Sequence, residues 1–135
     1  MLHYFNQNLL RSTLLADGIL SLAAGAGLLS LAAPVAALAG PAASPAIVAS
    51  IGAGLLLWGT FHLVMGRQAQ PSRSAVRIAI TGDLLWVLAS LMLLVLARDA
   101  FSTAGLIIVA VAMVGVADLM LLKMKGLSRQ SAHMA

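Results

Sequence analysis

The sequence predicts an all-α membrane protein in which four transmembrane helices form an antiparallel up-down bundle. Of its 135 residues, 61% are hydrophobic and only 9% are charged, whereas a soluble domain is typically about 45–50% apolar and about 25% charged. A chain this short cannot bury so much apolar surface in a water-soluble core, so that surface must face lipid. Four apolar stretches approach the roughly 20 residues that a helix needs to cross about 30 Å of hydrocarbon. They lack the alternation of a β-barrel, and lipid tolerates only helices or closed barrels.

The spans are expected at about residues 13–33, 46–65, 78–96 and 104–122. Pro34 should end or kink the first span, because proline cannot donate a helical hydrogen bond. Gly126 is placed where a helix commonly ends in a left-handed residue. The sequence therefore predicts one transmembrane domain over residues 1–126 and a disordered cytoplasmic tail over residues 127–135.

The first apolar run has a rival interpretation as a cleavable signal peptide. It follows Arg11, and the later Ala37-Leu38-Ala39 resembles a cleavage site. However, the run is longer than the usual signal-peptide core of about 7–15 residues, and it contains Asp17. We therefore expect this segment to remain as the first span.

The positive charges are distributed unequally between the two sides of such a bundle. Seven of the eight fall on one side, and only Arg98 falls on the other. The seven are Arg11, Arg67, Arg73, Arg77, Lys123, Lys125 and Arg129. Because Lys and Arg accumulate in cytoplasmic loops, this split predicts a multi-pass protein of the bacterial inner membrane with both termini cytoplasmic.

The charged positions also suggest an internal repeat. Arg11 and Asp17 in the first span are matched by Arg77 and Asp83, 66 residues later. With a shift of 56 residues, His62 falls on Asp118 and Arg67 falls on Lys123. The pattern is that of two tandem helical hairpins.

The same spacing places one ionisable side chain of each span in a single polar layer. Asp17 and Asp83 each lie six residues inside an arginine, and His62 and Asp118 each lie five residues inside a cation. At 1.5 Å per residue, all four sit about 8–9 Å inward of those cations. An ionisable group at this depth is expected to face the bundle interior or a water-filled vestibule.

Four further side chains share the helix faces of this layer and are expected to support it: Ser21, Trp58, Trp86 and Ser90. The two tryptophans stand near mid-bilayer, where their indole N–H groups need acceptors, which favours burial between helices. Small residues four positions apart, Ala23 with Gly27 and Ser50 with Gly54, predict close approaches between helices.

Two interpretations of the polar layer remain open. In the first, snorkelling cations pair with the carboxylates, and the protein is a structural or accessory membrane subunit that packs against lipid, a second copy or a larger complex. In the second, the layer serves a small proton- or cation-linked transporter, in which His62 changes charge near neutral pH. We favour the first, because short loops leave no soluble domain and almost no polar chemistry outside the membrane.

Several classes of function are disfavoured by what the sequence contains. The absence of cysteine excludes disulfides, iron–sulfur clusters and thiolate catalysis. The cations lie at the ends of apolar runs rather than in a basic patch with aromatics, so a nucleic-acid partner is not expected. No pair of metal ligands has a usable sequence spacing, and no phosphate loop or nucleophile elbow occurs. We therefore expect no enzyme activity, no metal and no cofactor.

Three segments carry a resemblance to known proteins: Leu15-Ala16-Asp17-Gly18, residues 73–77 (RSAVR) and residues 83–90 (DLLWVLAS). At these segments, and over most of residues 9–127, the chain resembles a group of small, uncharacterised four-span bacterial inner-membrane proteins. The resemblance implies the topology and a bacterial origin, and it implies no particular activity. In that group Asn is common where Asp83 stands here, which implies that a charge at this position is not always required.

Overall fold

The computed structural model describes residues 2–132, with side chains described from Asn8 onward, and its regular elements are all helical. They are α1 (Leu2–Ser30), α2 (Ala32–Ala39), α3 (Pro45–Arg67), α4 (Arg73–Leu96), the 3₁₀ turn η1 (Arg98–Ala100) and α5 (Thr103–Ala132). Four segments are long and apolar enough to cross a membrane: Asn8–Ser30, Pro45–Arg67, Arg73–Leu96 and Thr103–Ala132. The predicted fold class, an all-α membrane protein with four spans, is confirmed.

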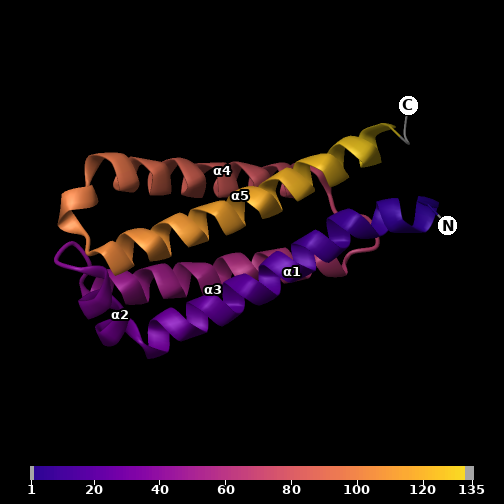
Figure 1. Cartoon of the computed structure of the whole chain (residues 1–135). Coiled ribbons are helices and arrows are strands. Elements are labelled where there is room, and N and C mark those ends of the chain that lie inside the picture. Colours follow the sequence, from indigo (N-terminus) through magenta and orange to yellow (C-terminus); the bar gives the residue numbers. More distant parts are fainter. Residues whose placement is uncertain (1, 133–135) are drawn as a thin grey trace.

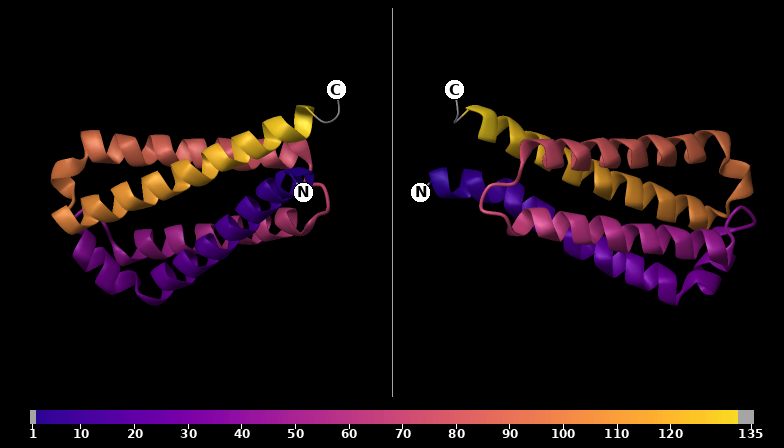
Figure 2. Two further views of the ribbon diagram at one scale, coloured as in Figure 1. Left: turned by 45° about the vertical axis from the view of Figure 1, so that its right-hand side comes forward. Right: turned by 180° about the vertical axis from the view of Figure 1, so that it is seen from behind.

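The helices run up and down along one axis (Figure 1). The start of α1, the end of α5 and the connection over residues 68–72 lie at one end of the bundle, called the terminal end below. At the opposite end, called the loop end, α2 and η1 connect the long helices (Figure 2). All seven cations that the sequence places on one side belong to segments at or near the terminal end.

The first span ends earlier than predicted. The helix is interrupted at Leu31, whose φ of −117° and ψ of 28° are not helical, and α2 then continues to Ala39. Pro34 has no N–H to donate to the carbonyl of Ser30, so the break lies one turn before the proline. The predicted span of 13–33 therefore crosses the bend between α1 and α2.

The fourth span, α5, ends later than predicted. It continues through Gly126 as far as Ala132, so the predicted disordered tail is helical over residues 127–132, and residues 133–135 lie outside the described part of the chain. Gly126 is not a helix terminator here because it is buried against α1. A Cβ at this glycine would lie 2.9 Å from the Cβ of Leu10.

The helices form two hairpins. α1 packs most extensively against α3, and α4 packs against α5, whereas the consecutive helices α3 and α4 scarcely touch. The hairpins meet mainly where α1 packs against α5 and, at the loop end, where α2 packs against α5. This arrangement agrees with the two tandem hairpins expected from the sequence.

Glycines allow the backbones of α1 and α3 to approach closely. A Cβ at Gly25 would lie 2.7 Å from the carbonyl oxygen of Gly52, and one at Gly52 would lie 2.9 Å from the carbonyl oxygen of Gly25. Gly18 and Gly59 approach each other's backbone in the same reciprocal way, seven residues from the first pair on each helix. Glycines seven residues apart lie almost two full turns apart, and therefore on one helix face.

The predicted close approaches at Gly27 and Gly54 are wrong. A Cβ at either glycine would meet nothing within 4 Å. The four-residue spacing identified small residues on each helix but selected the wrong face. The glycines that contact the other helix are spaced by seven residues, as Gly18 with Gly25 and Gly52 with Gly59.

This packing predicts different effects for two neighbouring substitutions in α1. Gly25→Ala should lower the melting temperature in detergent, because a new methyl group forced against the α3 backbone typically costs about 1–3 kcal/mol. Gly27→Ala is the matched control, since its methyl group meets nothing within 4 Å and should leave the melting temperature unchanged or slightly higher. Equal melting temperatures for both variants would contradict the glycine packing of α1 on α3.

Candidate functional site

A lysine ammonium lies inside the bundle, near its terminal end, and is bound by side chains from the other three spans. Lys123 of α5 is fully buried, and its Nζ donates to a carboxylate oxygen of Asp17 in α1. It also donates to Asp83 Oδ2 in α4 at 2.5 Å and contacts His62 Nε2 in α3 at 2.9 Å. We call these four residues the Lys123 cluster. Asp17, His62 and Asp83 are no more than 5% exposed.

The orientation of the His62 ring is fixed by its neighbours. Its Nδ1 lies 2.8 Å from the carbonyl oxygen of Trp58. A carbonyl can only accept, so Nδ1 carries the proton and Nε2 is left to accept from Lys123. The ring lies edge-on to both Trp58 and Phe61, with centroids 5.0 Å and 5.6 Å away. His62 is therefore a neutral acceptor within the cluster.

All three donor hydrogens of the ammonium are used, but its charge does not balance the charges around it. One ammonium faces two carboxyl groups, and the histidine is neutral, so with both aspartates ionised the cluster has a formal charge of −1. Asp17 is further stabilised because its Oδ1 accepts a hydrogen bond from Ser21 at 3.0 Å. Asp83 Oδ1 accepts no hydrogen bond from any residue that the structure describes. Of the two carboxyl groups, Asp83 therefore has fewer hydrogen-bond donors among the described residues than Asp17 has.

Lys123 is predicted from the sequence as a cation at the membrane boundary, and the structure places it inside the bundle instead. In a helix the Cα–Cβ bond tilts toward the N-terminus, which for α5 is toward the bundle interior. The long flexible stem extends this reach to the Asp and His side chains.

Some of the other cations predicted at the membrane boundary are exposed, namely Arg67, Arg77 and Lys125. Arg11 donates to the carbonyl of Gly66 at 3.4 Å, and Arg73 to the carbonyl of Gln130 at 3.5 Å.

Asp118 does not join the other three predicted members of the layer. It is exposed, and it makes no hydrogen bond or ion pair with the described residues. It precedes Lys123 by five residues, which at about 100° per residue turns the two side chains about 140° apart. Since Lys123 points into the bundle, Asp118 points away from the cluster.

An apolar layer seals the cluster from the terminal end. It consists of Leu10 and Leu14 of α1, Met65 of α3, and Val76 and Ala79 of α4, each no more than 4% exposed. On every one of these helices the apolar residue lies closer to the terminal end than the cluster residue does. Water at that end is therefore separated from the ammonium by packed hydrocarbon.

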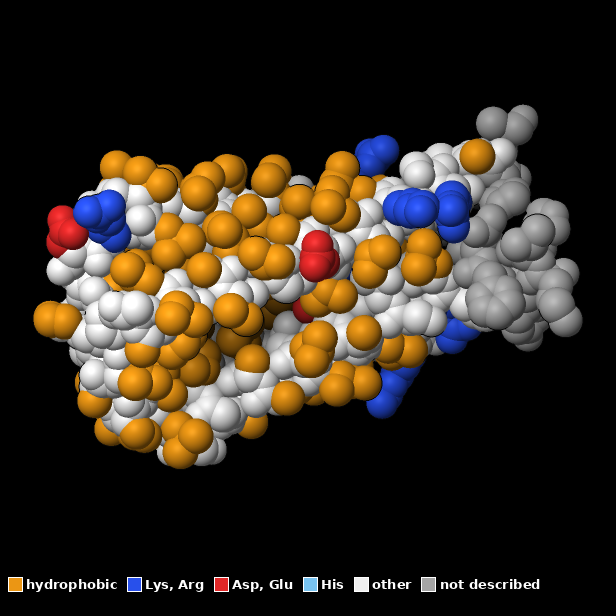
Figure 3. Space-filling view, viewed as in Figure 1, with side chains coloured by type: hydrophobic (Ala, Val, Ile, Leu, Met, Phe, Trp, Pro, Cys, Tyr) orange, Lys and Arg blue, Asp and Glu red, His pale blue; other side chains and the backbone are white. Residues whose placement is uncertain are grey.

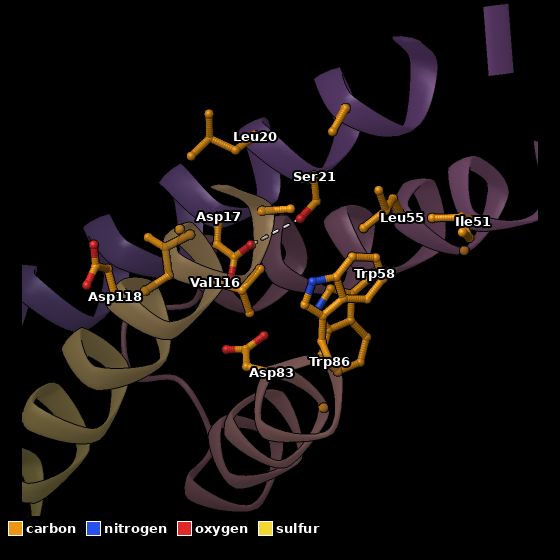
Figure 4. Close-up of a pocket in the computed structure, with 16 residues that line it drawn as sticks. Asp17, Leu20, Ser21, Ile51, Leu55, Trp58, Asp83, Trp86, Val116 and Asp118 are labelled. Atoms are coloured by element: carbon orange, nitrogen blue, oxygen red, sulfur yellow. Dashed lines mark hydrogen bonds between the residues drawn. The ribbon is translucent and has the colours of Figure 1, made fainter. Parts of the chain in front are cut away.

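On its other side the cluster faces a cavity of about 710 Å³ between the two hairpins. Asp17, Ser21 and Asp83 lie at one end of this cavity, and Trp58 and Trp86 form part of its wall (Figure 4). The Trp58 ring extends from α3 to lie over Gly82 of α4, where a Cβ would collide with it. The remaining wall is mainly aliphatic, from all four long helices.

The two other predicted supporting side chains have different surroundings. Trp86 Nε1 is buried without a hydrogen-bond partner among the described residues, so the acceptor predicted for it is not found there. Ser90 is buried on the same helix at 6% exposure but is not among the residues that line the cavity.

The ligand atoms of Asp17, His62 and Asp83 lie within 4.8 Å of one another, a grouping that could hold a metal ion. Sequence spacing did not reveal it, because the three residues come from three different helices. In the structure these atoms are bound by the Lys123 ammonium. The chain itself therefore supplies the cation that this group of ligands requires.

No family model, curated protein or solved structure matches this chain. The features of the structure that bear on function are the Lys123 cluster, the apolar layer and the cavity.

The cluster predicts that Lys123→Met is strongly destabilising, because it leaves two buried carboxylates without a cation. Removing one partner of a buried ion pair typically costs about 3–5 kcal/mol, so the melting temperature in detergent should fall steeply. Lys125→Met, which removes an exposed lysine from the same helix, is the control and should change little. Adding Asp17→Asn and Asp83→Asn to Lys123→Met should recover much of the loss. A Lys123→Met variant as stable as Lys125→Met would show that the ammonium does not hold the helices together.

Proposed function

We propose that the protein is a non-enzymatic structural or accessory component of the bacterial inner membrane. The observation that carries this proposal is the Lys123 ammonium, whose three hydrogens are all taken by partners on the other three spans. A charge bound in this way acts as an internal clasp between the two hairpins. Its role is to fix one arrangement of the bundle.

The surroundings of the clasp support a structural role over proton relay. A relay exchanges protons with water, and the layer around Leu14 and Val76 separates the cluster from the terminal end. The connections between the spans are short: they cover residues 31–44, which include α2, residues 68–72, and residues 97–102, which include η1. They leave little polar chemistry for catalysis outside the membrane.

The topology that we propose places the terminal end in the cytoplasm. That end carries the exposed cations Arg67, Arg77 and Lys125, whereas Arg98 at the loop end pairs with Asp99 at 3.4 Å. The excess of unbalanced positive charge favours retention on the cytoplasmic side.

Because the chain contains no cysteine, single introduced cysteines can test this orientation. Asp99→Cys at the loop end should react with a membrane-impermeant maleimide in cells whose outer membrane alone is opened. Gln70→Cys, exposed at the terminal end, should react only after the inner membrane is disrupted. The opposite pattern of labelling would overturn the proposed orientation.

A small proton- or cation-linked transporter is the second candidate. It is favoured by one observation, the cavity that reaches Asp17 and Asp83 from the middle of the bundle. In a transporter the carboxylates would exchange Lys123 for a proton or cation during each cycle.

Flux measurements distinguish the two candidates. If the clasp is structural, proteoliposomes with an internal pH-sensitive dye should acidify no faster than protein-free liposomes under an imposed proton gradient. Asp83→Asn should then remain folded, because an amide oxygen can still accept from Lys123, whereas Asp83→Leu should melt at a lower temperature because it removes that partner. Proton or cation flux that is present in the original chain and lost in Asp83→Asn, at an unchanged melting temperature, would instead establish transport.

A further inference from the structure

We propose that the cavity between the hairpins binds a membrane-soluble amine, a molecule with an apolar body and one protonated amino group. The cavity volume of about 710 Å³ is within the range of about 300–1,000 Å³ that small-molecule sites occupy. Like such sites, it has mainly apolar walls and a few polar groups that converge at one end.

The ionisable groups in the wall select the charge of the ligand. Three of the four acids in the whole chain line this one cavity, namely Asp17, Asp83 and Asp118, and no Lys or Arg lines it. The ammonium of Lys123 lies behind Asp17 and Asp83 and neutralises only one of these two carboxylates. A cationic head group would complete the charge balance, whereas an anionic one would be repelled.

One acceptor atom is available to such a head group. Asp83 Oδ2 is occupied by Lys123, but Oδ1 accepts no hydrogen bond from the described residues. Figure 4 shows the Asp83 carboxylate directed into the space between Asp17 and Trp86. An ammonium on the ligand could therefore donate to Asp83 without displacing Lys123.

The aromatic part of the wall suits the same chemistry. Trp58 and Trp86 both line the cavity beside these carboxylates. Indole faces attract cations electrostatically, and tryptophan is the best of the aromatic side chains for this contact. Carboxylates and indoles together are a recognition set for an ammonium group attached to an apolar body.

The ligand would enter from the bilayer. Figure 3 shows the molecular surface hollowed between α5 and α1, among apolar side chains and with an acidic side chain at the rim. Asp118, which is exposed and lines the cavity, is placed to attract a cation at this opening. The apolar layer that contains Leu14 and Val76 seals the terminal end. A ligand dissolved in lipid therefore has a more direct path to the cavity than a ligand in the water at that end.

A neutral chain, such as a lipid acyl tail, would fill the apolar volume equally well. It would leave the negative charge of Asp83 and Asp118 without a counter-charge in a medium of low polarity, which is unfavourable. The inference goes beyond the proposed structural role, because binding at this site requires neither transport nor a change in the clasp.

Intrinsic fluorescence can test binding, since the only two tryptophans of the chain both line the cavity. The probe is 4-(4-bromophenyl)butylamine, whose bromine quenches nearby indoles, and 4-(4-bromophenyl)butan-1-ol is its neutral match. Both are titrated into protein held in nanodiscs of zwitterionic lipid at pH 7. The amine should quench saturably, with a Kd about tenfold below that of the alcohol, as expected for a hydrogen bond to a charged group.

Three neutralised variants locate the site. Asp83→Asn should weaken amine binding about tenfold, and Asp118→Asn about threefold, each leaving binding of the alcohol unchanged. Asp99→Asn, at the loop end in η1, is the control and should have no effect. Because Asp118 lies outside the Lys123 cluster, its variant remains informative if Asp83→Asn fails to fold.

Either of two results would overturn the inference. One is quenching that rises linearly and equally with both probes, which reports partition into lipid alone. The other is an amine affinity that is unchanged in every folded variant among Asp83→Asn and Asp118→Asn. Neither result bears on the structural clasp, which is tested separately by Lys123→Met.

Discussion

A single positive charge held within an apolar bundle constrains the whole arrangement of this protein. An isolated ammonium at such a depth costs at least about 2.5–3.5 kcal/mol on insertion scales. Lys123 avoids that cost because α1, α3 and α4 each place one acceptor against its Nζ. Each of these helices is therefore fixed in both rotation and height relative to α5. A turn or slip of any one of them would leave a buried charge or acceptor without its partner.

The cluster and the glycine contacts perform different tasks. Gly25 and Gly52 bring α1 and α3 together over their lengths, whereas α3 and α4 scarcely touch. The two hairpins are joined by the Lys123 cluster near the terminal end and by α2 at the loop end, where Ser102 Oγ donates to the carbonyl of Leu38 at 2.5 Å. Between these two junctions the helices do not close completely. The cavity is the space that this pattern of packing leaves.

The sequence predicted the spans and the depth of the polar residues better than the direction in which the polar side chains point. Counting residues inward from the boundary arginines placed Asp17, His62 and Asp83 at one height, and the structure brings these three together. The same count placed Asp118 with them, because height alone does not say which way a side chain points. The sequence did not predict Lys123 as a member of the cluster, because residue counting gives the depth of its backbone and not the depth that its long side chain reaches. Asp118 and Lys123 are five residues apart, and this spacing turns their side chains to different faces of α5. That spacing is the signal that could have corrected the predictions for both residues.

The clasp and the cavity share the same carboxylates, and this connects stability with ligand binding. Asp83 gives one oxygen to Lys123 and presents the other to the cavity. Removing its charge therefore acts on both the interior lysine and any cation in the cavity. A neutral amide still serves the clasp, because hydrogen bonding to Lys123 needs only an oxygen acceptor, but it no longer offers a charge to a ligand. The net charge of −1 is not needed to hold four helices together, since one carboxylate would balance one ammonium. The second carboxylate is the part of this cluster that a purely structural role leaves unexplained, and a cationic occupant of the cavity accounts for it.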